Sequence, residues 1–151
     1  MSDISRVTNH DLDDLLPLLR AYCDFYEVGP SDEALHALCE ALIGDPDREG
    51  VQLIARDEGG AAVGFATIYW CWGTLDATRI GIMNDLYVAP SARGSGLAVD
   101  LINACLEEAR RHDAGHLTWQ TAKDNLRAQR VYDRIGAARA EWVDYSLPVS
   151  S

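Results

Sequence analysis

The feature that most constrains how this chain folds is a glycine-rich turn between Asn84 and Leu101, where a strand pattern changes into a helix pattern. The strand-like run IMNDLYV ends before Pro90, and RGSG then leads into apolar residues at helical spacing. The first N–H groups of a helix lack partners within it and lie at the positive end of its dipole, so they favour a bound phosphate. Gly94 and Gly96 allow a close backbone approach, and the arginine before them adds charge. A tight turn without a ligand has the same residues, so the motif alone leaves both interpretations open.

Two familiar phosphate-binding motifs do not fit this turn. A P-loop requires Gly-Lys-Ser/Thr after its glycines, and that triplet is absent. A dinucleotide fingerprint requires a small residue where Val99 stands, within a strand–helix–strand unit. Asp113 stands near the distance of the ribose-binding acid in that fingerprint, but two predicted helices and a hairpin precede the turn. The sequence therefore favours neither a nucleoside triphosphate nor a dinucleotide.

Apolar spacing and turn residues predict a mixed α+β domain. The predicted order is a strand, two helices, several strands, and then strand, helix, strand, helix and strand. We expect strands at residues 4–7, 51–56, 61–72, 79–88, 116–121 and 138–147. We expect helices from a capping box of Thr8 and Asp11 to 25–27, from Ser31 to 44–46, from Gly94 to Gly115, and from Asp124 or Asn125 to Gly136.

Length and charge bound the classes of function. The 151 residues suffice for one hydrophobic core, and we expect a single domain over residues 1–151. A formal net charge of −11 argues against nucleic acid as a partner and suits a cationic small molecule. The longest apolar run, residues 63–72, is too short for a membrane, because a spanning helix needs about 20 residues.

The N-terminus and the cysteines predict a cytoplasmic chain. MSDISRV has neither the basic nor the apolar region of a signal peptide. No two cysteines form a Cys-x-x-Cys pair, so we expect all four, Cys23, Cys39, Cys71 and Cys105, to be reduced and packed in the core. No metal site is expected, because Gly115 interrupts the pair His112 and His116 and no cysteine stands close to it.

The motifs around the turn form a longer pattern, NDLYV…RGSG…WQTAKDN…RVYDRIGA…W. It resembles the GCN5-related N-acetyltransferase (GNAT) superfamily, whose signature Q/R-x-x-G-x-G/A is matched by Arg93, Gly96 and Ala98. The spacing is most similar to the small-amine branch, which includes spermidine/spermine and thialysine acetyltransferases. The resemblance implies an α+β GNAT fold, with a mixed, mostly antiparallel sheet flanked by helices, and transfer of an acetyl group from acetyl-CoA (coenzyme A).

The resemblance implies that the glycine turn and the strand before it hold the cofactor. Amides of the turn would bind the pyrophosphate of acetyl-CoA, through Arg93, Gly94, Ser95, Gly96, Leu97 and Ala98. The backbone of Leu86, Tyr87 and Val88 would pair with the pantetheine amides as if with an added strand, and a main-chain N–H there would stabilise the oxyanion. For this pairing, strands 79–88 and 116–121 should splay apart. The side chains of Leu86 and Val88 also suit plain core packing.

Two residues after the turn extend the cofactor assignment. Asn125 matches a position that contacts the cofactor arm, and it suits a helix cap equally well. Tyr132 matches the tyrosine that bonds to the thioester sulfur and protonates the departing thiolate. A tyrosine on the inner face of a helix is otherwise a packed core residue. The resemblance therefore implies that Tyr132 is both a cofactor contact and the catalytic acid.

Asp85 is the second candidate catalytic residue. The substrate amine would attack the thioester directly, and an alkyl ammonium with a pKa of about 10 must first lose a proton. Asp85 could accept that proton or anchor the cation; its alternative role is a hydrogen-bond acceptor at the strand end. Polyamine enzymes have Glu-Asp where this chain has Asn84-Asp85, which weakens the prediction of a polyamine substrate. Strand geometry predicts that these two side chains point to opposite faces.

The segment at the end of the first helix is expected to form a wall of the acceptor pocket. Tyr22, Phe25, Tyr26 and Glu27 combine aromatic rings with a carboxylate, which suits an ammonium group. Asn84 and Asp85 complete the predicted substrate-binding set. Trp70, Trp72 and Asp76 could face the same space, but core aromatics and a solvated acid explain them as well.

The sequence thus predicts an acetyl-CoA-dependent N-acetyltransferase for a small, cationic primary amine, acting as a homodimer with Trp142 and Tyr145 as interface candidates. Rival acceptors are an aminoglycoside, an amino acid or a protein N-terminus. Two other classes stay open: a non-catalytic acyl-CoA-binding regulator, and an interaction module that keeps the fold without binding a cofactor.

Overall fold

The computed structural model describes residues 2–149 and divides the chain into two compact units, residues 1–120 and residues 121–151, which we describe one at a time. The first unit contains the sheet, three α-helices and the glycine turn. The second contains one helix and the C-terminal segment.

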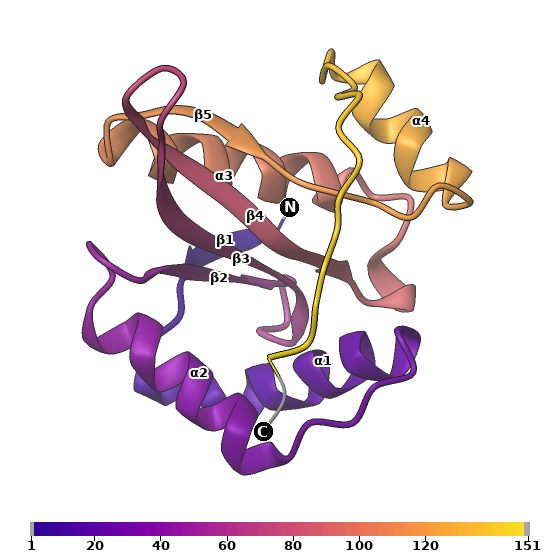
Figure 1. The fold of residues 1–151 in the computed structure, drawn as a ribbon. Helices are drawn as coiled ribbons and strands as arrows, with labels where there is room; N and C mark the ends of the chain where they lie inside the picture. The colour runs from indigo at the N-terminus through magenta and orange to yellow at the C-terminus, as the bar shows by residue number, and fades with distance from the viewer. Residues whose placement is uncertain (1, 150–151) are drawn as a thin grey trace. The chain divides into compact units, whose positions relative to one another are not determined.

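The first unit is built on a five-stranded sheet in the order β1-β2-β3-β4-β5 (Figure 1). Every neighbouring pair is antiparallel except β4 and β5, which are parallel. This mixed, mostly antiparallel arrangement confirms the predicted fold class. The strands are β1 (Asp3–Arg6), β2 (Gly50–Arg56), β3 (Ala62–Gly73), β4 (Thr78–Val88) and β5 (Ala114–Thr118).

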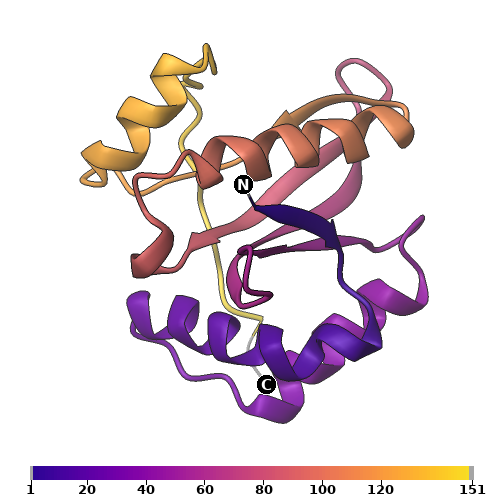
Figure 2. The ribbon, with the colours of Figure 1, turned by 180° about the vertical axis from the view of Figure 1, so that it is seen from behind.

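Helices cover both faces of this sheet. The helices α1 (Leu12–Phe25) and α2 (Asp32–Gly44) lie on one face, and α3 (Leu97–Arg111) lies on the other (Figures 1 and 2). The expected caps form: Thr8 and Asp11 make a capping box around a short 3-10 helix, η1 (Asn9–Asp11), and the Ser31 hydroxyl accepts from the Ala34 N–H. The core between α1, α2 and the sheet is apolar and includes Leu15, Leu19, Leu35, Cys39, Ile54 and Phe65.

The parallel pair at the sheet edge is short. β4 pairs with β5 only from Arg79 to Ile82, and the remaining residues of β4 continue to Val88 against β3 alone. The predicted splaying of these two strands is therefore present. It also explains why β5 ends at Thr118, three residues before the predicted end at Thr121, since a strand ends where its partner diverges.

The second unit confirms one predicted helix and corrects one predicted strand. The helix α4 (Leu126–Arg134) is capped by Asn125, whose Oδ1 accepts from the Ala128 N–H. Its C-cap Ile135 is followed by Gly136, whose φ is 87°. Residues 138–147, predicted as a strand, have no regular secondary structure. Alternating apolar residues do not form a strand alone, because its N–H and C=O groups need a neighbouring strand, and none pairs with them among the described residues.

Three further observations concern the described residues as a whole. No helix within residues 2–149 is long and apolar enough to cross a membrane. No group of three or more histidine, cysteine or acidic side chains in that range is arranged to hold a metal ion. Cys23, Cys39 and Cys105 are buried free thiols, as expected, whereas Cys71 is half-buried.

Candidate active site

The glycine turn forms an open cradle at the N-terminus of α3. Gly94 and Gly96 have φ angles of 80° and 85°, in the left-handed region that favours glycine, and a Cβ at either would meet no atom within 4 Å. These angles delay the helix to Leu97, three residues after the predicted start at Gly94. The first helical hydrogen bond runs from the Asp100 N–H to the Gly96 carbonyl. The N–H groups before Asp100 therefore have no partner within the helix. The space and the donors fit a phosphate group.

Two side chains fix the shape of this turn. The Ser95 hydroxyl donates to the carbonyl of Ala92, in the 3-10 helix η2 (Pro90–Ala92), at 2.5 Å. Arg93 Nε donates to the Val88 carbonyl at 3.2 Å, which ties the guanidinium to the end of β4. The turn is therefore attached to the strand whose backbone is predicted to receive the pantetheine arm.

The last residues of β4 have one edge with which no described strand pairs, although Arg93 already donates to the Val88 carbonyl. Leu86, Tyr87 and Val88 pair with Ala66, Phe65 and Gly64 of β3, while pairing with β5 has already ended at Ile82. An edge with unpaired N–H and C=O groups accepts an extended chain that carries amides. The edge and the glycine turn that follows it thus fit the pantetheine and pyrophosphate parts of acetyl-CoA in the predicted order.

A bulge at Asn84 corrects the prediction for the next two residues. Thr67 of β3 faces Asp85, whereas its neighbour Ile68 faces Met83, so Asn84 is an extra residue in β4. Strict alternation would place the Asn84 and Asp85 side chains on opposite faces. The bulge instead lets them meet, and Asn84 Nδ2 donates to Asp85 Oδ1 at 3.0 Å.

Asp85 is a half-buried carboxylate with only neutral partners. Burial raises its pKa, while the neighbouring hydroxyls of Thr67 and Tyr22 and the Asn84 amide partly offset that rise. Among the residues that the structure describes, no lysine, arginine or histidine forms an ion pair with it. A carboxylate held in this way can accept a proton or a cation.

The predicted aromatic wall lies partly beside Asp85. The Tyr22 hydroxyl donates to the Asn84 carbonyl at 3.4 Å, and burial with the Asp85 charge raises the pKa of Tyr22. Tyr26 stacks edge-on against Tyr22, and Phe25 stacks edge-on against Tyr26, with 5.1 Å between ring centroids in both pairs. Glu27 is exposed and forms no ion pair within the described residues.

Three residues beside Asp85 were missed by the sequence interpretation. Thr67 and Tyr69 of β3 point to the face of α1 and α2, and Gln52 of β2 stands opposite Thr67. Burial and the Asp85 charge raise the pKa of Tyr69 to about 12. The sequence did contain a signal for this site, since Thr67 and Tyr69 alternate with apolar residues along β3. The side chains that they face, however, depend on the register between strands.

The tryptophans considered for this space lie elsewhere. Trp70 points to the α3 face, where its ring stacks on His112 with 4.0 Å between centroids, and its indole N–H donates to the Pro46 carbonyl. Trp72 is exposed and lies beneath the Arg79 guanidinium. The alternation of β3 therefore removes Trp70 from the acceptor side.

Asn125 and Tyr132 belong to the second unit. Asn125 acts there as the cap of α4, which was its alternative role, and this leaves its cofactor role a prediction. Tyr132 lies in the last turns of the same helix, and its carbonyl accepts from the Ala137 N–H beyond the helix end. Its role as an acid likewise stays a prediction.

Comparison with known proteins identifies the family. The model of the acetyltransferase (GNAT) family matches residues 15–137. An uncharacterised N-acetyltransferase of Bacillus subtilis is 31% identical over 134 residues, covering 89% of this chain and 88% of that protein. The thialysine N-epsilon-acetyltransferase of Mus musculus is 23% identical over 149 residues, covering 89% of this chain and 82% of that protein. A solved structure of a probable acetyltransferase is 32% identical, with a TM-score of 0.84 and 99% of both chains covered.

The family match extends over the whole candidate site. The matched range includes the bulged strand, the glycine turn and α4. The chain therefore belongs to the acetyltransferase (GNAT) family and is an N-acetyltransferase whose acetyl donor is acetyl-CoA.

Proposed function

We propose that this N-acetyltransferase acts on a primary amine of a small, cationic molecule. The observation that carries the proposal is the Asp85 carboxylate, which is half-buried beside Tyr22 and Tyr69 and has no cationic partner among the described residues. An ammonium group would supply the missing positive charge, and the tyrosine rings would add cation–π attraction. The net charge of −11 favours the approach of such a cation.

The chemistry follows from the order of groups along β4 and the turn. Acetyl-CoA supplies an acetyl group activated as a thioester. The turn from Arg93 to Ala98 would hold its pyrophosphate, and the free edge of Leu86–Val88 would bind its amide-bearing arm. Asp85, one residue before that edge, would take the proton that the ammonium must lose before it attacks. A main-chain N–H of the same edge would donate to the acetyl oxygen as negative charge develops.

We propose that Tyr132 is the acid that protonates the departing thiolate and that Asn125 contacts the cofactor arm. Both assignments rest on the resemblance and on the family match, which includes both residues. We also propose that the two units together form one acetyltransferase domain. A Tyr132→Phe variant that turns over as fast as the parent chain near neutral pH would remove the assignment of the acid.

We propose that the chain acts in the cytoplasm as a homodimer. The C-terminal segment supports a dimer, since it carries a run of exposed apolar side chains, and a contiguous exposed apolar patch marks an interaction surface. Trp142, Val143, Tyr145 and Leu147 are 81%, 73%, 93% and 91% exposed. Sedimentation at the monomer mass at micromolar concentration would contradict the dimer.

Release of the coenzyme A thiol in the presence of a panel of amines tests the proposed function. We expect turnover with small diamines or amino acids that carry a side-chain amine, and little with an aminoglycoside or a peptide N-terminus. Acetyl-CoA alone should also raise the melting temperature, because a ligand that binds only the folded state stabilises it. A shift without thiol release for any amine would instead indicate a non-catalytic acyl-CoA-binding regulator.

The glycine cradle predicts a selective effect on the donor. Gly96→Ala should raise the KM for acetyl-CoA about tenfold or more, because the Cβ enters the phosphate space and a left-handed alanine costs about 1–2 kcal/mol. Steady-state kinetics with varied acetyl-CoA measure this change. Gly60→Ala is the matched control, since Gly60 has a φ of 86° and equally open surroundings in the β2–β3 turn. Equal changes in KM for both variants would contradict the assignment.

A further inference from the structure

We propose that Gln52 and Thr67 are positioning residues, which form a hydrogen-bonded row with Asp85 across three strands and aim the Thr67 hydroxyl at its carboxylate. The consequence of this row for catalysis rests on the proposed function of Asp85 as the base. The row itself is a feature of the fold and is tested separately below.

Strand register places the three side chains in line. Gln52 of β2 stands opposite Thr67 of β3, and Thr67 stands opposite Asp85 of β4. All three point to the sheet face that α1 and α2 cover. Gln52 Nε2 donates to Thr67 Oγ1 at 3.3 Å. The Thr67 hydroxyl, opposite Asp85 in register, is the hydrogen-bonding neighbour that most offsets the raised pKa of Asp85.

The row is buried within apolar surroundings. Thr67 is 0% exposed and Gln52 is 3% exposed, and the next row of the same face is formed by Ile54 and Phe65, both 0% exposed. The hydrogen bond between Gln52 and Thr67 does not satisfy all of their polar atoms, because Gln52 Oε1 is buried without a hydrogen-bond partner. Buried polar groups that lack a partner cost stability, so core packing alone does not explain why they stand here.

The direction of the first hydrogen bond determines what the second can do. A hydroxyl has one hydrogen to donate, and the Gln52 amide occupies an acceptor site on Thr67 Oγ1. The Thr67 hydrogen is then available for the Asp85 carboxylate. A donor held in this way favours the ionised form of the acid, which is the form that accepts a proton.

The other titratable groups around Asp85 stay neutral while it titrates. Burial and the Asp85 charge raise the pKa values of Tyr22 on α1, Tyr69 on β3 and Cys39 on α2. Each remains protonated at neutral pH, since each pKa lies above its ordinary value. The titration of Asp85 therefore reports its own hydrogen bonds.

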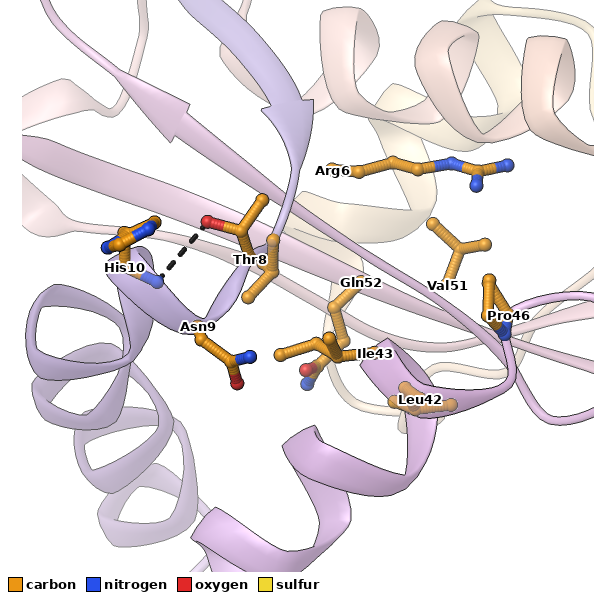
Figure 3. A pocket seen from close by; sticks show the side chains of 10 residues that line it. Arg6, Thr8, Asn9, His10, Leu42, Ile43, Pro46, Val51 and Gln52 are labelled. Atoms are coloured by element: carbon orange, nitrogen blue, oxygen red, sulfur yellow. Dashed lines mark hydrogen bonds between the residues drawn. The ribbon is translucent and has the colours of Figure 1, made fainter.

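The far end of the row allows a mild substitution. Gln52 lines a cavity of about 420 Å³ together with Leu42, Ile43 and Val51 (Figure 3). Methionine has nearly the volume of glutamine and adapts to irregular space. We therefore expect Gln52→Met to fold while removing the amide donor.

The test is an NMR titration of the chain labelled with carbon-13 at aspartate carboxyls, in which Asp85→Asn identifies the Asp85 signal. Thr67→Val removes the hydroxyl and keeps the side-chain shape, and it should raise the pKa of Asp85 by about one pH unit. Thr67→Ser, which retains the hydroxyl, should restore the parent value. Gln52→Met should cause a smaller rise in the parent chain and none in the Thr67→Val background.

The outcomes separate this inference from the proposed function. An unchanged Asp85 titration in both Thr67→Val and Gln52→Met would overturn the row. If Thr67→Val does not fold, the Asp85 titration in Gln52→Met alone decides whether the row exists. The acid limb of kcat/KM should shift by the same amount as the NMR titration. A shift in the NMR titration without one in kcat/KM would support the row and remove Asp85 as the base.

Discussion

Asp85→Asn should lower kcat by about 10²–10⁴-fold at neutral pH, the usual range for loss of a general base. The amide keeps the shape of the side chain but cannot take the proton that the substrate ammonium must lose. Thiol release at saturating amine and acetyl-CoA measures the loss. Asp13→Asn on the exposed first turn of α1 makes the same change in charge and should leave kcat unchanged.

The pH dependence of the parent chain should agree with this result. Because burial raises the pKa of Asp85, the carboxylate is lost as the pH falls through that raised value. The acid limb of kcat/KM should therefore lie above the ordinary aspartate range, and it should be absent from the residual activity of Asp85→Asn. An acid limb at the ordinary pKa of about 3.9 would contradict the assignment.

Stability distinguishes a catalytic Asp85 from a structural one. The pKa of Asp85 is higher in the folded state than in the unfolded state. The contribution of Asp85 to stability is therefore complete at a pH below its unfolded pKa, and it is lost as the pH rises through its folded pKa. Asp85→Asn should thus raise the melting temperature at neutral pH by about 2–4 °C for each kcal/mol relieved, and by nothing near pH 3. If the melting temperature fell together with the activity, Asp85 would be a structural acceptor only.

Phe65→Ala should lower the free energy of unfolding by about 3–5 kcal/mol, since it removes a large side chain from a closed core. Phe65 is 0% exposed and packs against Tyr22 and Tyr87, with ring centroids at 5.7 and 5.9 Å. A loss of this size is a large part of the typical total of about 5–15 kcal/mol. Urea denaturation followed by circular dichroism measures it.

Phe25→Ala is the matched control for this substitution. Phe25 is 64% exposed and contacts Tyr26, so the same change should alter stability by about 0.5 kcal/mol or less. Its expected effect is on the KM for the amine, because its ring belongs to the predicted acceptor wall. Equal stability losses in both variants would show that the core has been placed wrongly around Phe65.

Local signals along the sequence predicted most of the elements. Helix caps act over a few neighbouring residues, so they can be predicted without knowledge of any partner strand. The examples are the capping box of Thr8 and Asp11, the Ser31 cap and Gly136. Residues 138–147 show the converse. Their alternation indicates which side chains would share a face of a strand, but it does not indicate which other strand would pair with them. No strand among the described residues pairs with this segment.

The sequence by itself determined the family and the acetyl donor, and it located the turn that we propose holds this donor, because these depend on motifs whose residues are close together in the chain. Only the tertiary structure decided the surroundings of Asp85. A one-residue bulge at Asn84 brought two side chains together that alternation had separated, and strand register placed Thr67 and Gln52 beside them. Register is set by long-range pairing between strands, and a shift of one residue moves every side chain to the other face.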